Sequence, residues 1–134
     1  MGNRAVLQFK ENNNTLDTGI YLHWNGGRDT IEPLLEVAKE YQIRGGDYGI
    51  ARLCQIIGNT FDGGLGLGIG HLEELDRDNC DNGTYVIDSG KWEIVDRLFK
   101  VNPEQKHWPF EEMKAHIKKA NDKFYYDDDG KLKR

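Results

Sequence analysis

The sequence has little of what marks disulfide-stapled, membrane-spanning or nucleic-acid-binding proteins. Its 134 residues include only two cysteines, which is too few for a disulfide framework. No apolar run approaches the roughly 18 residues that a membrane helix needs, and residues 1–10 lack the apolar core of a signal peptide. Basic residues are outnumbered by acidic ones, 18 to 23, which is the wrong balance for neutralising phosphates. We therefore expect a cytoplasmic protein with reduced thiols that neither enters a membrane nor binds nucleic acid directly.

The composition that is present suits one folded domain. Hydrophobic residues make up 37% of the chain and aromatic residues 10%, so a chain of this length can bury a core without a metal or disulfide. The last residues, DDDGKLKR, are polar and have no periodic pattern. We expect a single domain over residues 1–126 and a mobile C-terminal tail over residues 127–134.

Two periodicities alternate along the chain. Apolar and polar residues alternate, or β-formers cluster, in five runs that predict strands at 5–10, 19–24, 63–70, 84–88 and 91–99. Apolar residues at helical spacing predict helices at about 30–42, after Asp47, and at 110–124. The last of these has its apolar stripe at Phe110, Met113, Ile117 and Phe124. Either Asp29 or Thr30 could cap the first of these helices, and Asp47 the second. This order predicts an α+β fold: a mainly antiparallel sheet of about five strands, with three helices mostly on one face.

The segment GGLGLGIG at 63–70 places glycine at every second position. In a strand, one face of this segment would be bare backbone, which favours close packing of an aromatic ring or another backbone. It matches neither common glycine-rich phosphate-binding motif, and no basic residue follows it. We expect a structural role for these glycines.

Most of the excess negative charge lies in one segment, residues 71–89. This segment has six acidic residues and one arginine. It is either a solvated acidic loop or a patch that steers the protein toward a basic partner. The candidate contacts in it are Glu73, Glu74, Asp76, Asp78 and Asp81.

The stretch HWNGGRD at 23–29 joins an imidazole, an indole, a guanidinium and a carboxylate where a strand gives way to a helix. Such junctions often carry sites. These side chains either have structural roles, with Trp24 in the core, or form a recognition surface. We take His23, Trp24 and Arg28 as further candidate contacts.

Catalytic and metal-binding patterns are weak. Cys80 lies in the most acidic segment and Cys54 on an apolar helix face, so neither thiol is expected to be activated, and we predict no catalytic residues. The metal donors His23, Cys54, His71 and Cys80 show no paired zinc-ligand spacing. No cofactor is expected, and zinc is an alternative only if the fold gathers these four residues.

Three strings resemble an uncharacterised family of small proteins of phages and mobile elements of Firmicutes-type bacteria: NRAV at 3–6, GIYLHWNGGRDTIEPLLE at 19–36 and YGIARLCQIIGNTF at 48–61. The resemblance runs from about residue 3 to about residue 99, and the C-terminal 35 residues do not share it. It carries no catalytic motif. It implies a phage-type accessory protein, and such proteins are often stoichiometric antagonists of host defence, anti-CRISPR inhibitors of RNA-guided nucleases among them.

Composition and resemblance together predict a small acidic inhibitor, without enzymatic activity, that acts in the bacterial host cytoplasm. Its expected partner is a host protein with a basic surface, such as an RNA-guided nuclease whose nucleic-acid-binding surface it blocks. Two alternatives stay open: a zinc-binding or metal-dependent small domain or enzyme, and a structural or self-assembling phage module.

Overall fold

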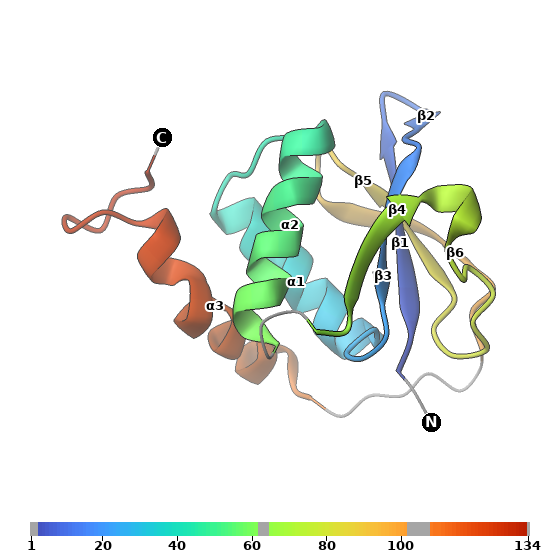
Figure 1. Ribbon diagram of the computed structural model, residues 1–134. Coiled ribbons are helices and arrows are strands. Elements are labelled where there is room, and N and C mark those ends of the chain that lie inside the picture. Colours follow the sequence, from blue (N-terminus) through green and yellow to red (C-terminus); the bar gives the residue numbers. More distant parts are fainter. Residues whose placement is uncertain (1–2, 62–64, 102–107, 134) are drawn as a thin grey trace.

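One mixed sheet and three helices form the fold in the computed structural model, which describes residues 3–61, 65–101 and 108–133 (Figure 1). The strands are β1 (Ala5–Glu11), β2 (Asn14–Thr15), β3 (Thr18–Leu22), β4 (Leu67–His71), β5 (Thr84–Asp88) and β6 (Glu93–Leu98). The helices are α1 (Arg28–Glu40), α2 (Gly46–Thr60), α3 (Phe110–Tyr125) and the short 3-10 helix η2 (Leu72–Glu74). The expected α+β class is confirmed.

The strand order is β4-β3-β1-β5-β6, with the short β2 paired to β1. The β1–β5 pair is parallel, with Leu7 opposite Tyr85, and the other pairs are antiparallel. The sheet therefore has six strands and is mixed, where the sequence predicted about five in a mainly antiparallel arrangement. The parallel pair joins segments nearly 80 residues apart, and no local pattern reports such a pairing.

The three helices lie on one face of the sheet, as predicted (Figure 1). The side chains of Ala5, Leu7 and Phe9 on β1 enter the core on this face, together with Ile31 and Leu34 of α1. From α2, Ile50, Leu53, Ile56 and Ile57 complete the same cluster. Full burial of a leucine or isoleucine side chain contributes roughly 1.5–3 kcal/mol, so this cluster is the main source of stability.

Helix α3 packs on α1 and α2 through a narrower stripe than the sequence predicted. Met113 and Ile117 are buried as expected, but Phe110 and Phe124 are exposed. Asn121 takes the next position of the stripe, and its side-chain nitrogen donates to the Ile56 carbonyl oxygen of α2 at 3.3 Å. The hydrogen-bonded amide of Asn121 therefore occupies a buried position of α3 where the spacing of Met113 and Ile117 favours an apolar side chain.

Helices α1 and α2 begin one or two residues earlier than the predicted caps. Gly27 precedes α1 and Gly45 precedes α2, and neither has a side chain to cap the helix. The carboxylate of Asp29 instead accepts a hydrogen bond from the backbone N–H of Trp108 at 2.9 Å. The predicted caps were wrong because a distant partner binds Asp29 and because glycine occupies both cap positions.

The glycine-rich strand is shorter than predicted, since β4 begins at Leu67 and residues 63 and 64 lie outside the described residues. Aromatic rings do pack against its glycines. Tyr21 of β3 lies opposite Gly68, and a Cβ at Gly66 would come within 2.9 Å of the Trp24 ring. The predicted close approach of aromatic rings is confirmed.

Residues 127–133 form a hydrogen-bonded turn after α3. The Asp127 N–H donates to the Lys131 carbonyl oxygen at 2.8 Å, and Tyr126 forms an antiparallel bridge with Leu132. Leu132 packs against the core cluster. The segment that the sequence assigned to a mobile tail thus has tertiary contacts, while its mobility stays a prediction.

Among the described residues, no helix is both long and apolar enough to cross a membrane.

Candidate interaction surface

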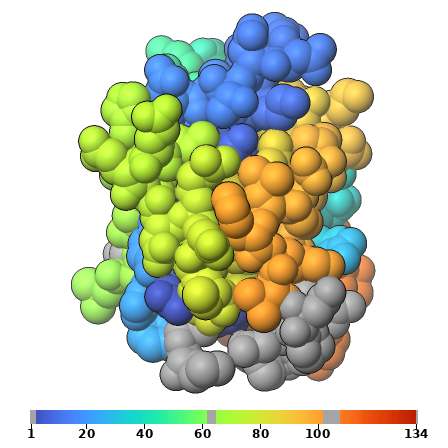
Figure 2. All heavy atoms as spheres, turned by 90° about the vertical axis from the view of Figure 1, so that its right-hand side faces the viewer, coloured from blue at the N-terminus to red at the C-terminus, as the bar shows by residue number. Residues whose placement is uncertain are grey.

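The acidic segment crosses the face of the sheet opposite the helices. Strands β4 and β5 run in the same direction, and β3 and β1 lie between them. Residues 72–83, which link β4 to β5 and which we call the acidic connection, therefore have to cross the sheet. They do so on the side of the sheet away from α1, α2 and α3 (Figure 1). Figure 2 shows this face, with the connection in lime to yellow beside β6 in orange. The connection covers the second face of β1, where Val6 and Gln8 are buried.

Two leucines fasten the start of the connection to the sheet. Leu72 and Leu75 point to Gly19 of β3, where an added Cβ would lie 3.1 and 3.0 Å from their methyl carbons. With the leucines turned inward, the neighbouring acidic side chains turn to solvent. The exposed carboxylates are those of Glu73, Glu74, Asp76 and Asp78.

The end of the connection is organised by Asn79, whose side chain is buried. Its amide nitrogen donates to the carbonyl oxygens of Asp76 and Gly83, both at 3.0 Å. Its amide oxygen accepts the backbone N–H groups of Asp81 at 3.1 Å and Gly83 at 2.9 Å. Four hydrogen bonds to one side chain hold this backbone in a defined conformation.

Arg4 ties the connection to the start of β1. Its guanidinium Nε lies 2.8 Å from a carboxylate oxygen of Asp81, and a terminal nitrogen lies 3.7 Å from Asp76. Burial raises the pKa of Asp81, but hydrogen bonds from the side chain and backbone of Arg4 outweigh it, so this pKa lies below its usual value. The Asp81 side chain is only 9% exposed. Asp81, predicted as a partner contact, therefore acts as a positioning residue in the free protein.

The structure brings the second predicted segment next to this one. Burial raises the pKa of Tyr21, and the charges of Asp76 and Asp81 raise it further while that of Arg4 lowers it, so Tyr21 lies beside the acidic cluster. The Tyr21 hydroxyl is 3.0 Å from Nδ1 of His23. The His23 ring meets the Trp24 ring edge to face at 4.6 Å. Tyr21 and His23 continue the acidic connection, and Trp24 lies at the edge of this surface, where it also faces the helix side of the sheet.

Sequence reasoning missed Arg4, Tyr21 and Asn79 as parts of this surface. Asn79 carries a local signal, since Asn in an Asp- and Gly-rich segment is typical of a turn. Arg4 and Tyr21 carry none, because their partners are remote in sequence. We call the combined set the acidic face, which consists of Tyr21, His23, Trp24, Glu73, Glu74, Asp76 and Asp78. The hydrogen bonds of Arg4, Asn79 and Asp81 hold the backbone of this face in place.

Arg28 lies outside the acidic face. It begins α1, where its Nε is 2.9 Å from a carboxylate oxygen of Glu32. It lines a hollow between α1 and β6 together with Lys39 and Arg97. The sequence placed Arg28 with His23 and Trp24 because they are neighbours in the chain, but the Gly26–Gly27 turn sends it to the other side of the sheet.

The four predicted metal donors are not brought together. His71 pairs with Thr18 at one end of the β3–β4 pair, and His23 follows β3 at the other end. Cys54 lies on α2, where burial raises the pKa of its thiol, and Cys80 is exposed in the connection. Within the part of the chain that the structure describes, no group of three or more His, Cys, Asp or Glu residues could hold a metal ion.

Comparison with family models, with curated proteins and with solved structures finds no match to this chain.

Proposed function

We propose that the protein is a non-enzymatic, stoichiometric binder whose acidic face occupies a basic surface of a host defence protein. The observation that carries this proposal is the fixed geometry of the connection. Four exposed carboxylates stand on a backbone held by Asn79 and by the Arg4–Asp81 pair. Because folding already orders this backbone, binding to a partner does not carry the entropic cost of ordering it.

The chemistry of the face suits a surface that normally holds nucleic acid. A row of lysines and arginines that binds phosphates also attracts fixed carboxylates, and opposite fields accelerate the encounter. Trp24, which is 53% exposed, and the neighbouring His23 add flat rings at the edge of the charged region. Aromatic rings beside charges are typical of residues that dominate binding energy. An RNA-guided nuclease in the bacterial cytoplasm is the target that this proposal favours, as for anti-CRISPR inhibitors.

The test uses two variants of equal net charge. In the first, Glu73, Glu74, Asp76 and Asp78 are all changed to Lys. In the matched control, four exposed carboxylates of α3 and the C-terminal turn are changed to Lys: Glu111, Glu112, Asp128 and Asp129. Tagged wild type and both variants are used to capture partners from a lysate of a host with an active CRISPR system. Association rates with the recovered nuclease are then measured at low and high salt.

We expect wild type and control to recover the nuclease in near-stoichiometric amount. The acidic-face variant should associate at least about tenfold more slowly at low salt, and the difference should shrink as the Debye length falls from about 30 Å at 0.01 M to about 8 Å at 0.15 M. Recovery of no nuclease by the wild type would contradict the proposed target. Equal slowing in both variants would contradict the acidic face as the contact, since net charge alone would then explain the rate.

A further inference from the structure

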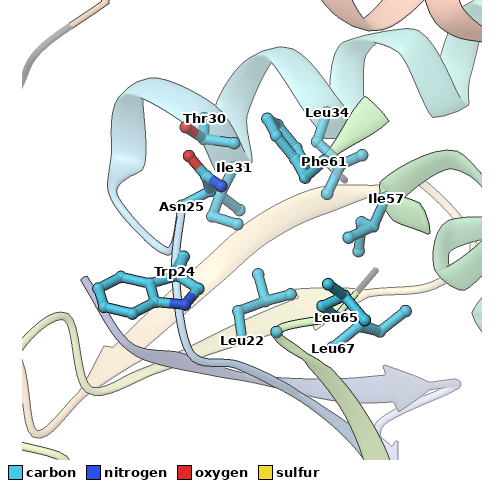
Figure 3. Close-up of a pocket in the computed structure, with 11 residues that line it drawn as sticks. Leu22, Trp24, Asn25, Thr30, Ile31, Leu34, Ile57, Phe61, Leu65 and Leu67 are labelled. Carbon is cyan, nitrogen blue, oxygen red and sulfur yellow. The ribbon is translucent and has the colours of Figure 1, made fainter. Parts of the chain in front are cut away.

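A pocket on the helix side of the sheet is separate from the acidic connection. It has a volume of about 420 Å³ and lies where the β3–β4 edge meets α1 and the end of α2 (Figure 3). Leu22 and Leu67 line it from the sheet, and Leu34, Ile57 and Phe61 line it from the helices. This volume falls in the range of small-molecule sites, which are usually apolar with a few placed polar groups.

Two of the three polar side chains of the pocket lie together, and the polar atom of the third lies apart (Figure 3). Figure 3 shows the side chains of Asn25 and Thr30 together at the α1 end and the nitrogen-bearing edge of the Trp24 ring turned toward Leu22. Thr30 is only 2% exposed. Within residues 3–61, 65–101 and 108–133, the side chains of Trp24, Asn25 and Thr30 make no hydrogen bond. The Thr30 hydroxyl is not among the described side-chain atoms that are both buried and without a partner, so it can still meet water or a ligand in the pocket.

Charge is absent from the described lining of the pocket, which contains no Asp, Glu, Lys, Arg or His. A charged ligand group would lose its hydration here and find no opposite charge among the described lining residues, which is unfavourable. The three polar side chains offer an indole N–H donor, a hydroxyl, and an amide that both donates and accepts. The hydroxyl and the amide lie together (Figure 3), and they complement a neutral group that also donates and accepts, such as a carboxamide or an alcohol.

We propose that this pocket binds an uncharged small molecule with an apolar body and a single amide-type or hydroxyl-type head. The body lies among Leu22, Leu34, Ile57, Phe61 and Leu67. The head meets the amide of Asn25 and the hydroxyl of Thr30, and the Trp24 ring borders the body beside Leu22 (Figure 3). Trp24 borders both the pocket and the acidic face, but none of the four carboxylates of the acidic face lines the pocket, so this site does not depend on the proposed function.

The test compares three probes that share one alkyl chain: hexanamide, hexanoate and hexylamine at neutral pH. Binding is followed by the shift of the Trp24 indole N–H signal in two-dimensional NMR, assigned with Trp24→Phe. We expect a saturable shift with hexanamide and at least about tenfold weaker binding of both charged probes, because burial of their charge is uncompensated. Absence of a saturable shift with hexanamide, or equal binding of the three probes, would overturn the proposal.

Two variants test the polar end. Thr30→Val keeps the side-chain shape and removes the hydroxyl. Asn25→Gly removes the amide at a position whose φ is 61°, which glycine adopts without strain. Each should weaken hexanamide binding about three- to tenfold, whereas the control Asn14→Gly, on the exposed β2, should leave it unchanged. If neither pocket variant weakens binding, the polar end does not recognise the head and the proposal fails.

A last comparison separates this proposal from the proposed function. The variant with Lys at positions 73, 74, 76 and 78 should bind hexanamide as the wild type does, because none of these residues lines the pocket. Loss of partner binding with retained hexanamide binding would assign the two activities to different sites. Loss of both, in a variant that remains folded by circular dichroism, would contradict a separate pocket.

Discussion

Single polar side chains hold the acidic connection against the sheet. Asn79 makes four hydrogen bonds within the connection, and Arg4 reaches Asp81 across 77 positions of the sequence. Asp81 looked like its exposed acidic neighbours because composition counts charges and does not show their partners. Burial of a carboxylate is tolerated here because an arginine satisfies it with short, charge-assisted hydrogen bonds.

Replacing Asp81 with Asn tests this pair. The hydrogen bonds from Arg4 outweigh burial and hold the folded pKa of Asp81 below its usual value. The contribution of the carboxylate is therefore complete above the unfolded pKa, near 4, and is lost as the pH falls through the lower folded pKa. We expect Asp81→Asn to lower the free energy of unfolding by about 1–3 kcal/mol at pH 7 and by much less near pH 2.

Urea denaturation at the two pH values measures this difference. Asp78→Asn, which changes an exposed carboxylate in the same connection, should alter the free energy of unfolding by less than about 0.5 kcal/mol. An equal loss at both pH values for Asp81→Asn would show that packing, and not the charge of Asp81, stabilises the connection.

Two glycines differ in whether the fold has room for a side chain at their position. Gly58 lies inside α2, and an added Cβ there meets no atom within 4 Å. Gly83 ends the acidic connection with φ of 67°, and an added Cβ would collide with the backbone of Leu98 and Phe99. The sequence shows both as glycine, and only the surroundings tell which one the fold requires.

Two alanine variants make this difference measurable. Gly58→Ala should raise the free energy of unfolding by about 0.5–1 kcal/mol, because alanine loses less conformational entropy in a helix. Gly83→Ala should lower it by more than about 2 kcal/mol, because the backbone is left-handed and the site is crowded. Thermal or chemical unfolding of both variants is the measurement. A neutral Gly83→Ala would mean that the end of the connection can shift away from β6 at little cost.

At the scale of the whole molecule, the sheet is covered on both faces by different means. Three helices bury one face with apolar side chains, and one acidic connection covers the other with two leucines and a polar network. This arrangement separates the stabilising core from the charged surface, so the outward carboxylates can change without disturbing the core. It also keeps His23, His71, Cys54 and Cys80 on separate elements.

The metal-dependent alternative predicts that folding depends on a bound ion, and the separation of the donors predicts the opposite. We expect protein purified without added metal to contain less than about a tenth of an equivalent of zinc. Dialysis against a chelator should leave its melting temperature unchanged, because no donor cluster among the described residues couples folding to a metal. About one equivalent of zinc per chain, with a fall in melting temperature on its removal, would contradict this expectation.

Local patterns in the sequence were enough to predict the two helices that the structure has at Arg28–Glu40 and Gly46–Thr60, the strands β5 and β6, and the aromatic packing on the glycine-rich strand. Each of these features depends on residues two to four positions apart in the sequence or on one face of a strand. The spacing of apolar residues along the sequence reveals such local relations. The parallel β1–β5 pair, the Arg4–Asp81 contact and the joining of Tyr21 to the acidic connection were decided by tertiary structure alone. Each brings together residues more than 50 positions apart, and only the packing of both sheet faces brings such residues within reach of one another.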